Sequence, residues 1–183
     1  MERLQSNAVL LSLIDNLQAK GSWCGETHVQ KATYFIQELF GVPLVFDFIL
    51  YKHGPFSFDL NDELTAMQAD QLLKVQSKPR PYGPSLVSTE GGERIKKHFA
   101  KTLNKYDKTV QFVTDRFGKR GVAELERLST AFYVTQRENV DGSVESRAKR
   151  INELKPHVKI EEAHEAVLMV DEIIEDARGV QIT

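Results

Sequence analysis

The sequence predicts a mostly α-helical (α+β) fold. We expect a winged-helix-like N-terminal part with a small β-ribbon, followed by a helical C-terminal part. Three observations support this prediction. Apolar residues recur at helical spacing along most of the 183 residues. Two short apolar stretches flank a proline-rich turn near the middle of the chain. Hydrophobic residues make up 41% of the sequence, which is enough for a packed core.

Helical periodicity defines the first two elements. Residues 7–20 carry one apolar stripe and are followed by Gly21, which is typical of a helix end. A second helix is predicted to begin after Thr27, the expected N-cap, and to end at about residue 40. Residues 44–51 are expected to form a strand or an extended segment, and residues 53–56 a turn.

The next elements have the order of a winged helix. Ser57 is expected to cap a third helix that ends near residue 69. Short strands are predicted at 72–75 and 86–88, on either side of a turn-rich insert. Thr89 is expected to cap a helix to about residue 105. The predicted winged-helix-like part therefore covers residues 1–105.

The C-terminal part, residues 106–183, is predicted to be helical and to pack on the first part as one compact unit. A helix with apolar residues at helical spacing is expected to end near Gln136. Ser143 is expected to cap the next helix, which Pro156 interrupts. The last helix is predicted over about 160–177.

Charge is distributed unevenly along the chain. The formal net charge of −2 combines −5 for residues 1–73, +8 for residues 74–120 and −5 for residues 121–183. A basic segment of this kind can attract a polyanion, and it can equally pair with the acidic segments of the same chain. Both interpretations remain open at this point.

Basic side chains make double-stranded DNA a candidate partner. Several of them lie on the proline-rich tip of the predicted wing or on the helix after it. Neutralising phosphates requires several such groups on one surface. Against ordinary groove docking, the third helix carries Asp59, Asp62 and Glu63, which would repel phosphate. The candidate nucleic-acid-binding residues are Lys78, Arg80, Arg94, Lys96, Lys97 and Lys101.

A group of aromatic residues makes a protein the other candidate partner. Phe46, Phe48, Tyr51, Phe56 and Phe58 lie within a short stretch around the predicted turn. Most of them are expected in the core, but any that remain exposed would anchor a partner well. Phe56 and Phe58 are the candidate partner-binding residues.

The sequence contains no arrangement that identifies a reaction. The single cysteine, Cys24, excludes an intramolecular disulfide and a zinc site of several cysteines. No phosphate-binding glycine loop and no nucleophile motif is present, so we expect no catalytic residue, metal or cofactor. No apolar run has membrane-spanning length, and the N-terminus lacks the features of a signal peptide, which together predict a cytoplasmic protein.

Two segments of the N-terminal half carry a family resemblance. They read Thr-His-Val-Gln-Lys-Ala-Thr-Tyr-Phe at 27–35 and Tyr-Lys-His-Gly-Pro-Phe-Ser at 51–57. Together they resemble the YwgA-like proteins of bacteria and archaea and, more remotely, the Panacea family. Segments 125–133 and 155–157 resemble the C-terminal half of the YwgA-like proteins. The positions that fall on the family motif are Gln30, Lys31, Tyr34, Phe35, Gly54 and Pro55.

The resemblance implies a non-catalytic regulatory or interaction protein of a prokaryote, antitoxin-like or associated with phage and defence loci. Panacea-type proteins are linked to the neutralisation of a toxin, so the implied partner is a toxin. The alternative function is a winged-helix transcriptional regulator that binds double-stranded DNA.

The motif positions also have a physical interpretation. Gly54-Pro55 favours a sharp turn. Lys31 is placed to reach a carbonyl near this turn. The ring of Tyr34 is expected in the core, with its hydroxyl as a tether.

Overall fold

The computed structural model describes residues 1–77, 83–138 and 141–180. Within these residues the chain is mostly helical, with eight helices and two small two-stranded antiparallel sheets. The helices are α1 (Arg3–Ala19), α2 (Glu26–Phe40), α3 (Phe58–Ala69), α4 (Glu90–His98), α5 (Ala100–Phe117), α6 (Val122–Arg137), α7 (Val144–Leu154) and α8 (Ile160–Ala177). The strands are β1 (Ile49–Tyr51), β2 (Gly54–Phe56), β3 (Leu73–Gln76) and β4 (Ser85–Ser88).

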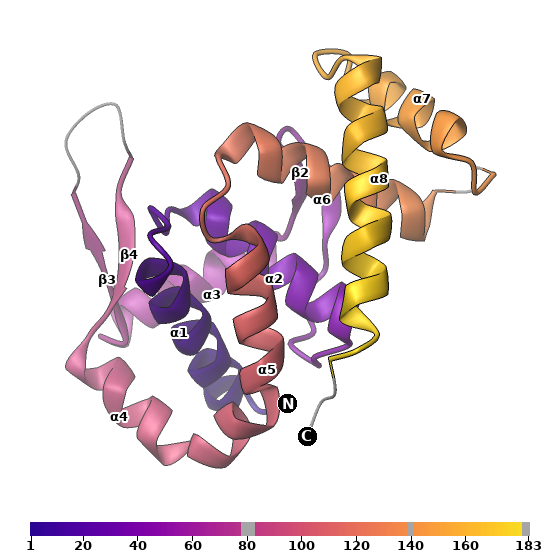
Figure 1. The fold of residues 1–183 in the computed structure, drawn as a ribbon. Helices are drawn as coiled ribbons and strands as arrows, with labels where there is room; N and C mark the ends of the chain where they lie inside the picture. The colour runs from indigo at the N-terminus through magenta and orange to yellow at the C-terminus, as the bar shows by residue number, and fades with distance from the viewer. Residues whose placement is uncertain (78–82, 139–140, 181–183) are drawn as a thin grey trace.

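Two short hairpins interrupt the helices. In the first, β1 pairs with β2 so that Ile49 lies opposite Phe56 and Tyr51 lies opposite Gly54. In the second, the predicted ribbon, β3 pairs with β4 from Leu73 opposite Ser88 to Gln76 opposite Ser85. Figure 1 shows the β3–β4 ribbon projecting on one side of the helical body, with α7 and α8 on the other side.

Helix α1 lies at the centre of the N-terminal part. It packs against α2, α4, α5 and β4, and residues 6–11 are buried without interruption. The expectation of a single apolar stripe is therefore wrong for this helix. A helix that is apolar on most of its circumference is covered on all sides, and the consecutive apolar residues Val9, Leu10 and Leu11 already indicate this.

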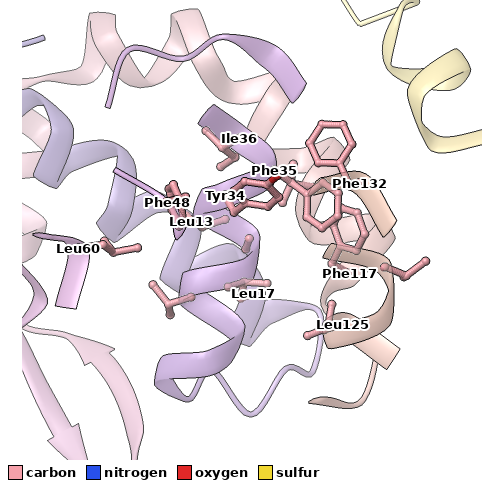
Figure 2. Packing of buried hydrophobic residues seen from close by; sticks show 14 of the residues in the cluster. Leu13, Leu17, Tyr34, Phe35, Ile36, Phe48, Leu60, Phe117, Leu125 and Phe132 are labelled. Atoms are coloured by element: carbon pink, nitrogen blue, oxygen red, sulfur yellow. The ribbon is translucent and has the colours of Figure 1, made fainter. Parts of the chain in front are cut away.

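The core is one continuous cluster that joins the N-terminal and C-terminal helices. Phe35 of α2 stacks on Phe117 of α5 and Phe132 of α6, with ring centroids 4.1 and 5.1 Å apart. Figure 2 shows these three rings together, with Tyr34 and Phe48 beside them. Aromatic contacts of this kind bury large apolar areas, so α2 is tied to both halves of the chain.

The helix expected after Thr89 is longer than predicted and is bent. Thr89 caps α4 by accepting a hydrogen bond from the N–H of Gly92. At Phe99 the backbone leaves helical geometry, and α5 then continues to residue 117. The boundary expected after residue 105 falls inside α5, beside the buried Tyr106.

Two further details differ from the sequence predictions. Gly25, rather than Thr27, is the N-cap of α2, so the helix begins one residue before Thr27. The expected turn at 53–56 is mostly strand, because β2 occupies 54–56 and only Lys52 and His53 form the turn.

The C-terminal helices pack on one another and on α6. Ser143 caps α7 as predicted, accepting from the N–H of Ser146. Arg147 of α7 donates two hydrogen bonds of 2.7 Å to the carboxylate of Asp171 on α8. Among the described residues, no helix combines the length and apolar character that crossing a membrane requires.

Candidate functional site

Gln30 connects α2 to the residue that follows the β1–β2 hairpin. Its side-chain amide donates to the carbonyl oxygen of Ser57 at 2.9 Å and accepts from the N–H of Ser57 at 3.0 Å. Both residues are fully buried. Because a buried backbone group without a partner is costly, this pair of bonds fixes where the hairpin leaves the core.

Lys31 lies beside Gln30 and holds the second strand of the hairpin. Its ammonium group donates to the carbonyl oxygen of Pro55 at 2.6 Å, although the residue is only 2% exposed. The expectation that Lys31 reaches a carbonyl near the turn is confirmed. A lysine this deeply buried is unusual, because burial strongly disfavours its charged form.

A second buried lysine holds the first strand of the hairpin and its turn. Lys155, just after α7, donates to the carbonyl oxygens of Tyr51 and Lys52, the latter at 2.6 Å. Lys155 is 6% exposed. The carbonyl groups of the hairpin therefore accept hydrogen bonds from two directions, from Lys31 of α2 and from Lys155 in the segment that joins α7 to α8.

Glu126 of α6 supplies the negative charge between these groups. Its carboxylate is nearly buried, with one oxygen 3.2 Å from Nδ1 of His53 and the other 3.1 Å from Nε2 of His157. Both histidine side chains are mostly exposed. We call Lys31, His53, Glu126, Lys155 and His157 the hairpin clamp.

Burial determines the electrostatics of the two lysines. It lowers the pKa of Lys31 to about 8, while Glu126 opposes the shift and the neighbouring charge of Lys155 adds to it. Burial likewise lowers the pKa of Lys155, and Glu126 again opposes the effect. The charge of Glu126 thus favours the charged form of both lysines, and the charge of Lys155 disfavours that of Lys31.

Gly54 allows the hairpin to approach α6 closely. Its φ is +83°, a conformation that residues with a side chain rarely adopt. A Cβ at this position would lie 3.0 Å from Ser129 Oγ and 3.0 Å from Thr130 Oγ1. The glycine of the motif is therefore required both by its own backbone and by the neighbouring helix.

The two aromatic residues of the motif belong to the core. The rings of Tyr34 and Phe35 are fully buried, and Tyr34 makes edge contacts with Phe48 and Phe132. The core position of the Tyr34 ring is confirmed, but the predicted tether is wrong. Its hydroxyl is buried and has no hydrogen-bond partner among the described residues.

The outer side of the hairpin carries an aromatic surface. Ile49 and Tyr51 lie on one face of β1, and Phe56 lies opposite Ile49 on β2. Phe58, at the start of α3, completes the group. The ring centroids of Tyr51, Phe56 and Phe58 are 5.1 to 5.9 Å apart. We call Ile49, Tyr51, Phe56 and Phe58 the aromatic face.

Tyr51 and Phe58 are more exposed than the other aromatic residues between positions 46 and 58. Tyr51 is 46% exposed and Phe58 is 52% exposed, whereas Phe48 is buried. Phe56 and Phe46 are partly buried. The general expectation that these aromatics belong to the core is wrong for Tyr51 and Phe58, because the clamp holds the opposite side of the hairpin against the protein.

The candidate nucleic-acid-binding residues fall into three groups. Lys78 and Arg80 lie outside the described residues. Lys96 is paired with Asp15 and Glu93. Arg94, Lys97 and Lys101 are exposed on α4 and α5, and none of the three has an ion pair within the described residues.

The clamp unites segments that are far apart in sequence. Glu126, Lys155 and His157 lie in the two C-terminal segments that carry the resemblance, but no local pattern marks them as site residues. The tertiary structure brings both segments to the hairpin that carries Gly54 and Pro55. All four resembling segments therefore meet at one place.

Other chemistry-bearing groups lie apart from the clamp. Cys24 is fully buried, and burial raises its pKa to about 12. His28 is also buried, and burial lowers its pKa. Within residues 1–77, 83–138 and 141–180, no group of three His, Cys, Asp or Glu side chains is arranged to hold a metal ion.

A small hollow lies between α3 and the β3–β4 ribbon. Glu26 is the only ionisable side chain among its described lining residues, so these residues offer no acid–base pair. The hollow is lined by Glu26, Asn61, Leu64, Thr65, Gln68, Val75, Pro84 and Leu86.

Comparison with known proteins leaves this geometry as the main guide to function. No protein-family model matches the chain, and no curated protein matches it.

Proposed function

We propose that the chain is a non-catalytic interaction protein that binds a protein partner through the aromatic face. The observation that supports this proposal is a group of three contacting rings, Tyr51 and Phe56 on the hairpin and Phe58 at the start of α3, with Tyr51 and Phe58 about half exposed. Exposed aromatic side chains that are held rigid are typical anchors of protein interfaces, because little freedom is lost when they bind.

The distribution of exposed apolar residues favours the same surface. Of the nine large hydrophobic residues exposed in the described part of the chain, Val45, Ile49, Tyr51 and Phe58 fall within residues 45–58. Val45 also has a φ of +67°, which is strained for a β-branched residue. Exposed apolar patches and strained backbone are both concentrated at binding sites.

The clamp explains how such a surface stays in place. A two-stranded hairpin of three-residue strands is not stable by itself in water. Lys31 and Lys155 of the clamp hold its backbone from the inner side, and Gln30 holds Ser57 directly after it, so the outer rings are presented in a fixed arrangement. This role suits buried lysines whose ammonium groups point at backbone carbonyls.

The proposal includes two finer points. The N-terminal part has a winged-helix-like arrangement, supported by three helices before the β3–β4 ribbon and α4 directly after it. The partner is a toxin in a prokaryotic toxin–antitoxin pair, supported by the resemblance to YwgA-like and Panacea proteins.

The test compares partner capture by matched variants in the native host. Tagged wild type is compared with a Tyr51→Thr/Phe58→Glu double variant after cross-linking, and captured proteins are identified by mass spectrometry. The partner is then purified and titrated. Losing a central aromatic anchor costs about 2 kcal/mol, or roughly thirtyfold in Kd.

Leu168→Glu is the matched control, because Leu168 of α8 is 46% exposed and lies outside the aromatic face. A partner lost by the double variant and kept by the control supports the proposal. A partner that binds the double variant with unchanged Kd contradicts it, provided that both variants unfold at the wild-type urea midpoint.

A further inference from the structure

A row of exposed cations lies along α4 and α5. Arg94 and Lys97 share one side of α4, and Lys101, Lys105 and Lys108 share one side of α5, because residues three or four apart in a helix lie on the same face. The two groups are separated by the bend at Phe99. All five are exposed. The inward side carries Gly92, Ile95, Phe99, Leu103 and Tyr106. We call the five cations the basic stripe.

The basic stripe differs from the other cations of the same segment. Lys96 is paired with Asp15, Arg116 with Asp176 and Arg120 with Glu124. These contacts neutralise part of the +8 segment internally. By contrast, no residue of the basic stripe forms an ion pair within the described residues. Lys105 makes only a contact with the ring of Tyr106.

The nearby acidic groups offset only part of this charge. Residues 90–108 carry six cations and three carboxylates, Glu90, Glu93 and Asp107, which leaves a net charge of +3, and Glu93 is paired with Lys96. Glu90, in the first turn of α4, lies at the positive end of the helix, where a carboxylate is stabilised. The basic stripe therefore presents a local excess of positive charge on a chain whose net charge is −2.

We propose that the basic stripe binds the phosphate backbone of double-stranded DNA without reading its base sequence. The stripe runs over at most roughly 21 Å of helix, at 1.5 Å per residue. Over that axial length the two strands of a duplex carry about twelve phosphates, one per 1.7 Å of axis, and the stripe can pair with those on the side that faces it. Four of the five cations are lysines, which bind phosphate as point charges, so the contacts position the duplex without specifying a sequence.

The rest of the surface is consistent with this mode of binding. Asp59, Asp62 and Glu63 make α3 acidic, so α3 is unsuited to enter a groove between phosphates. Single-strand binding needs aromatic side chains on which bases stack, and no Phe, Tyr or Trp is exposed on α4 or α5. Because the stripe and the aromatic face involve different residues, this inference does not depend on the proposed protein partner.

The experiment is fluorescence anisotropy of the full chain with a labelled random-sequence duplex of about 30 base pairs. Five phosphate contacts predict a slope of about −4.5 for log K against log salt concentration, and about a 500-fold loss of affinity between 50 and 200 mM salt. Lys97→Glu with Lys101→Glu is expected to reduce the magnitude of the slope by about 2. A labelled single strand of the same length is expected to bind more weakly.

Lys119→Glu with Lys149→Glu is the matched control. Both lysines are exposed, have no ion pair within the described residues, and give the same change in net charge. A loss confined to the stripe variant supports the inference. If that variant is unfolded by circular dichroism, Lys97→Gln with Lys101→Gln replaces it, because glutamine also favours helix.

Three results would overturn the inference. The first is no duplex binding at 50 mM salt. The second is an equal loss in the control variant, which would show an unspecific charge effect. The third is a loss only with Lys78→Glu and Arg80→Glu, which would assign binding to the wing. The Tyr51→Thr/Phe58→Glu variant is expected to bind DNA like wild type, whether or not the proposed protein partner exists.

Discussion

Lys31 Nζ donates a hydrogen bond of 2.6 Å to the carbonyl oxygen of Pro55, within a region that is almost closed to solvent. The two residues are 24 positions apart and join α2 to the second strand of the β1–β2 hairpin. Because Lys31 bonds to the backbone carbonyl of Pro55, this contact holds the hairpin without involving the Pro55 side chain.

Replacing Gln30 should weaken the fold more than replacing a glutamine on the surface. Gln30→Ala leaves the N–H and the carbonyl of Ser57 buried without partners, and it opens a cavity. We expect the free energy of unfolding to fall by about 2–4 kcal/mol in urea titrations. The control Gln111→Ala, at an exposed position of α5, should change it by less than about 0.5 kcal/mol. Equal effects of the two variants would show that Gln30 does not hold the hairpin.

Lys31 should make stability rise with pH above neutrality. Its pKa is lowered from 10.5 to about 8 in the folded protein, so between these values the unfolded chain binds more protons. Stability therefore increases with pH in this window, by about 3 kcal/mol in total from this group. The measurement is the difference in urea stability between wild type and Lys31→Met from pH 7.5 to 10.5.

This difference isolates Lys31 from Cys24, whose effect has the opposite sign. The pKa of Cys24 is raised from 9.0 to about 12, so above pH 9 the unfolded chain loses this proton while the folded protein keeps it. Stability from Cys24 is therefore lost as the pH rises, equally in both proteins. A flat difference between pH 8 and 9 would mean that Lys31 titrates normally.

Gly54 should tolerate alanine less well than a glycine of similar backbone geometry. Gly54→Ala combines a left-handed backbone with close approach to Ser129 and Thr130, which are both fully buried. We expect destabilisation of about 2–4 kcal/mol. Gly41 has a φ of +65° and nothing within 4 Å of its Cβ position, so Gly41→Ala should cost only about 1 kcal/mol. Thermal or urea unfolding of the two variants provides the comparison.

Cys24 should be unreactive in the folded protein. It is fully buried, and its raised pKa leaves about a thousandfold less thiolate at pH 8 than an ordinary thiol has. Titration with a thiol reagent at pH 8 should label the chain in urea and leave the native protein unlabelled over the same time. Rapid labelling of the native protein would show that the segment around Cys24 opens readily.

Much of the local structure could be read from the sequence, because it depends on residues close together in the chain. Ser57, Thr89 and Ser143 cap their helices as predicted. The β3–β4 ribbon lies where two short apolar stretches flank a turn. Capping involves residues three positions apart, so tertiary contacts are not needed to recognise it.

The errors at the element boundaries have a common cause. Gly25 replaces Thr27 as the N-cap of α2, and the helix after Thr89 bends at Phe99 and then continues through α5. Glycine and threonine are nearly equal as N-caps in local energy, so packing against other helices decides where such a helix begins. The prediction for Tyr34 failed for a related reason: tertiary packing leaves its buried hydroxyl without a hydrogen-bond partner among the described residues.

The sequence by itself determined the approximate positions of most helices, the ribbon and the reach of Lys31 to a carbonyl near Gly54-Pro55. The tertiary structure decided that Glu126, Lys155 and His157 meet Lys31 at the hairpin, and that Tyr51 and Phe58 face outward while Phe48 is buried. The physical reason is the sequence separation of the residues that interact. Caps and helical periodicity arise within one or two turns, whereas burial and the pairing of distant charges depend on which surfaces the folded chain brings together.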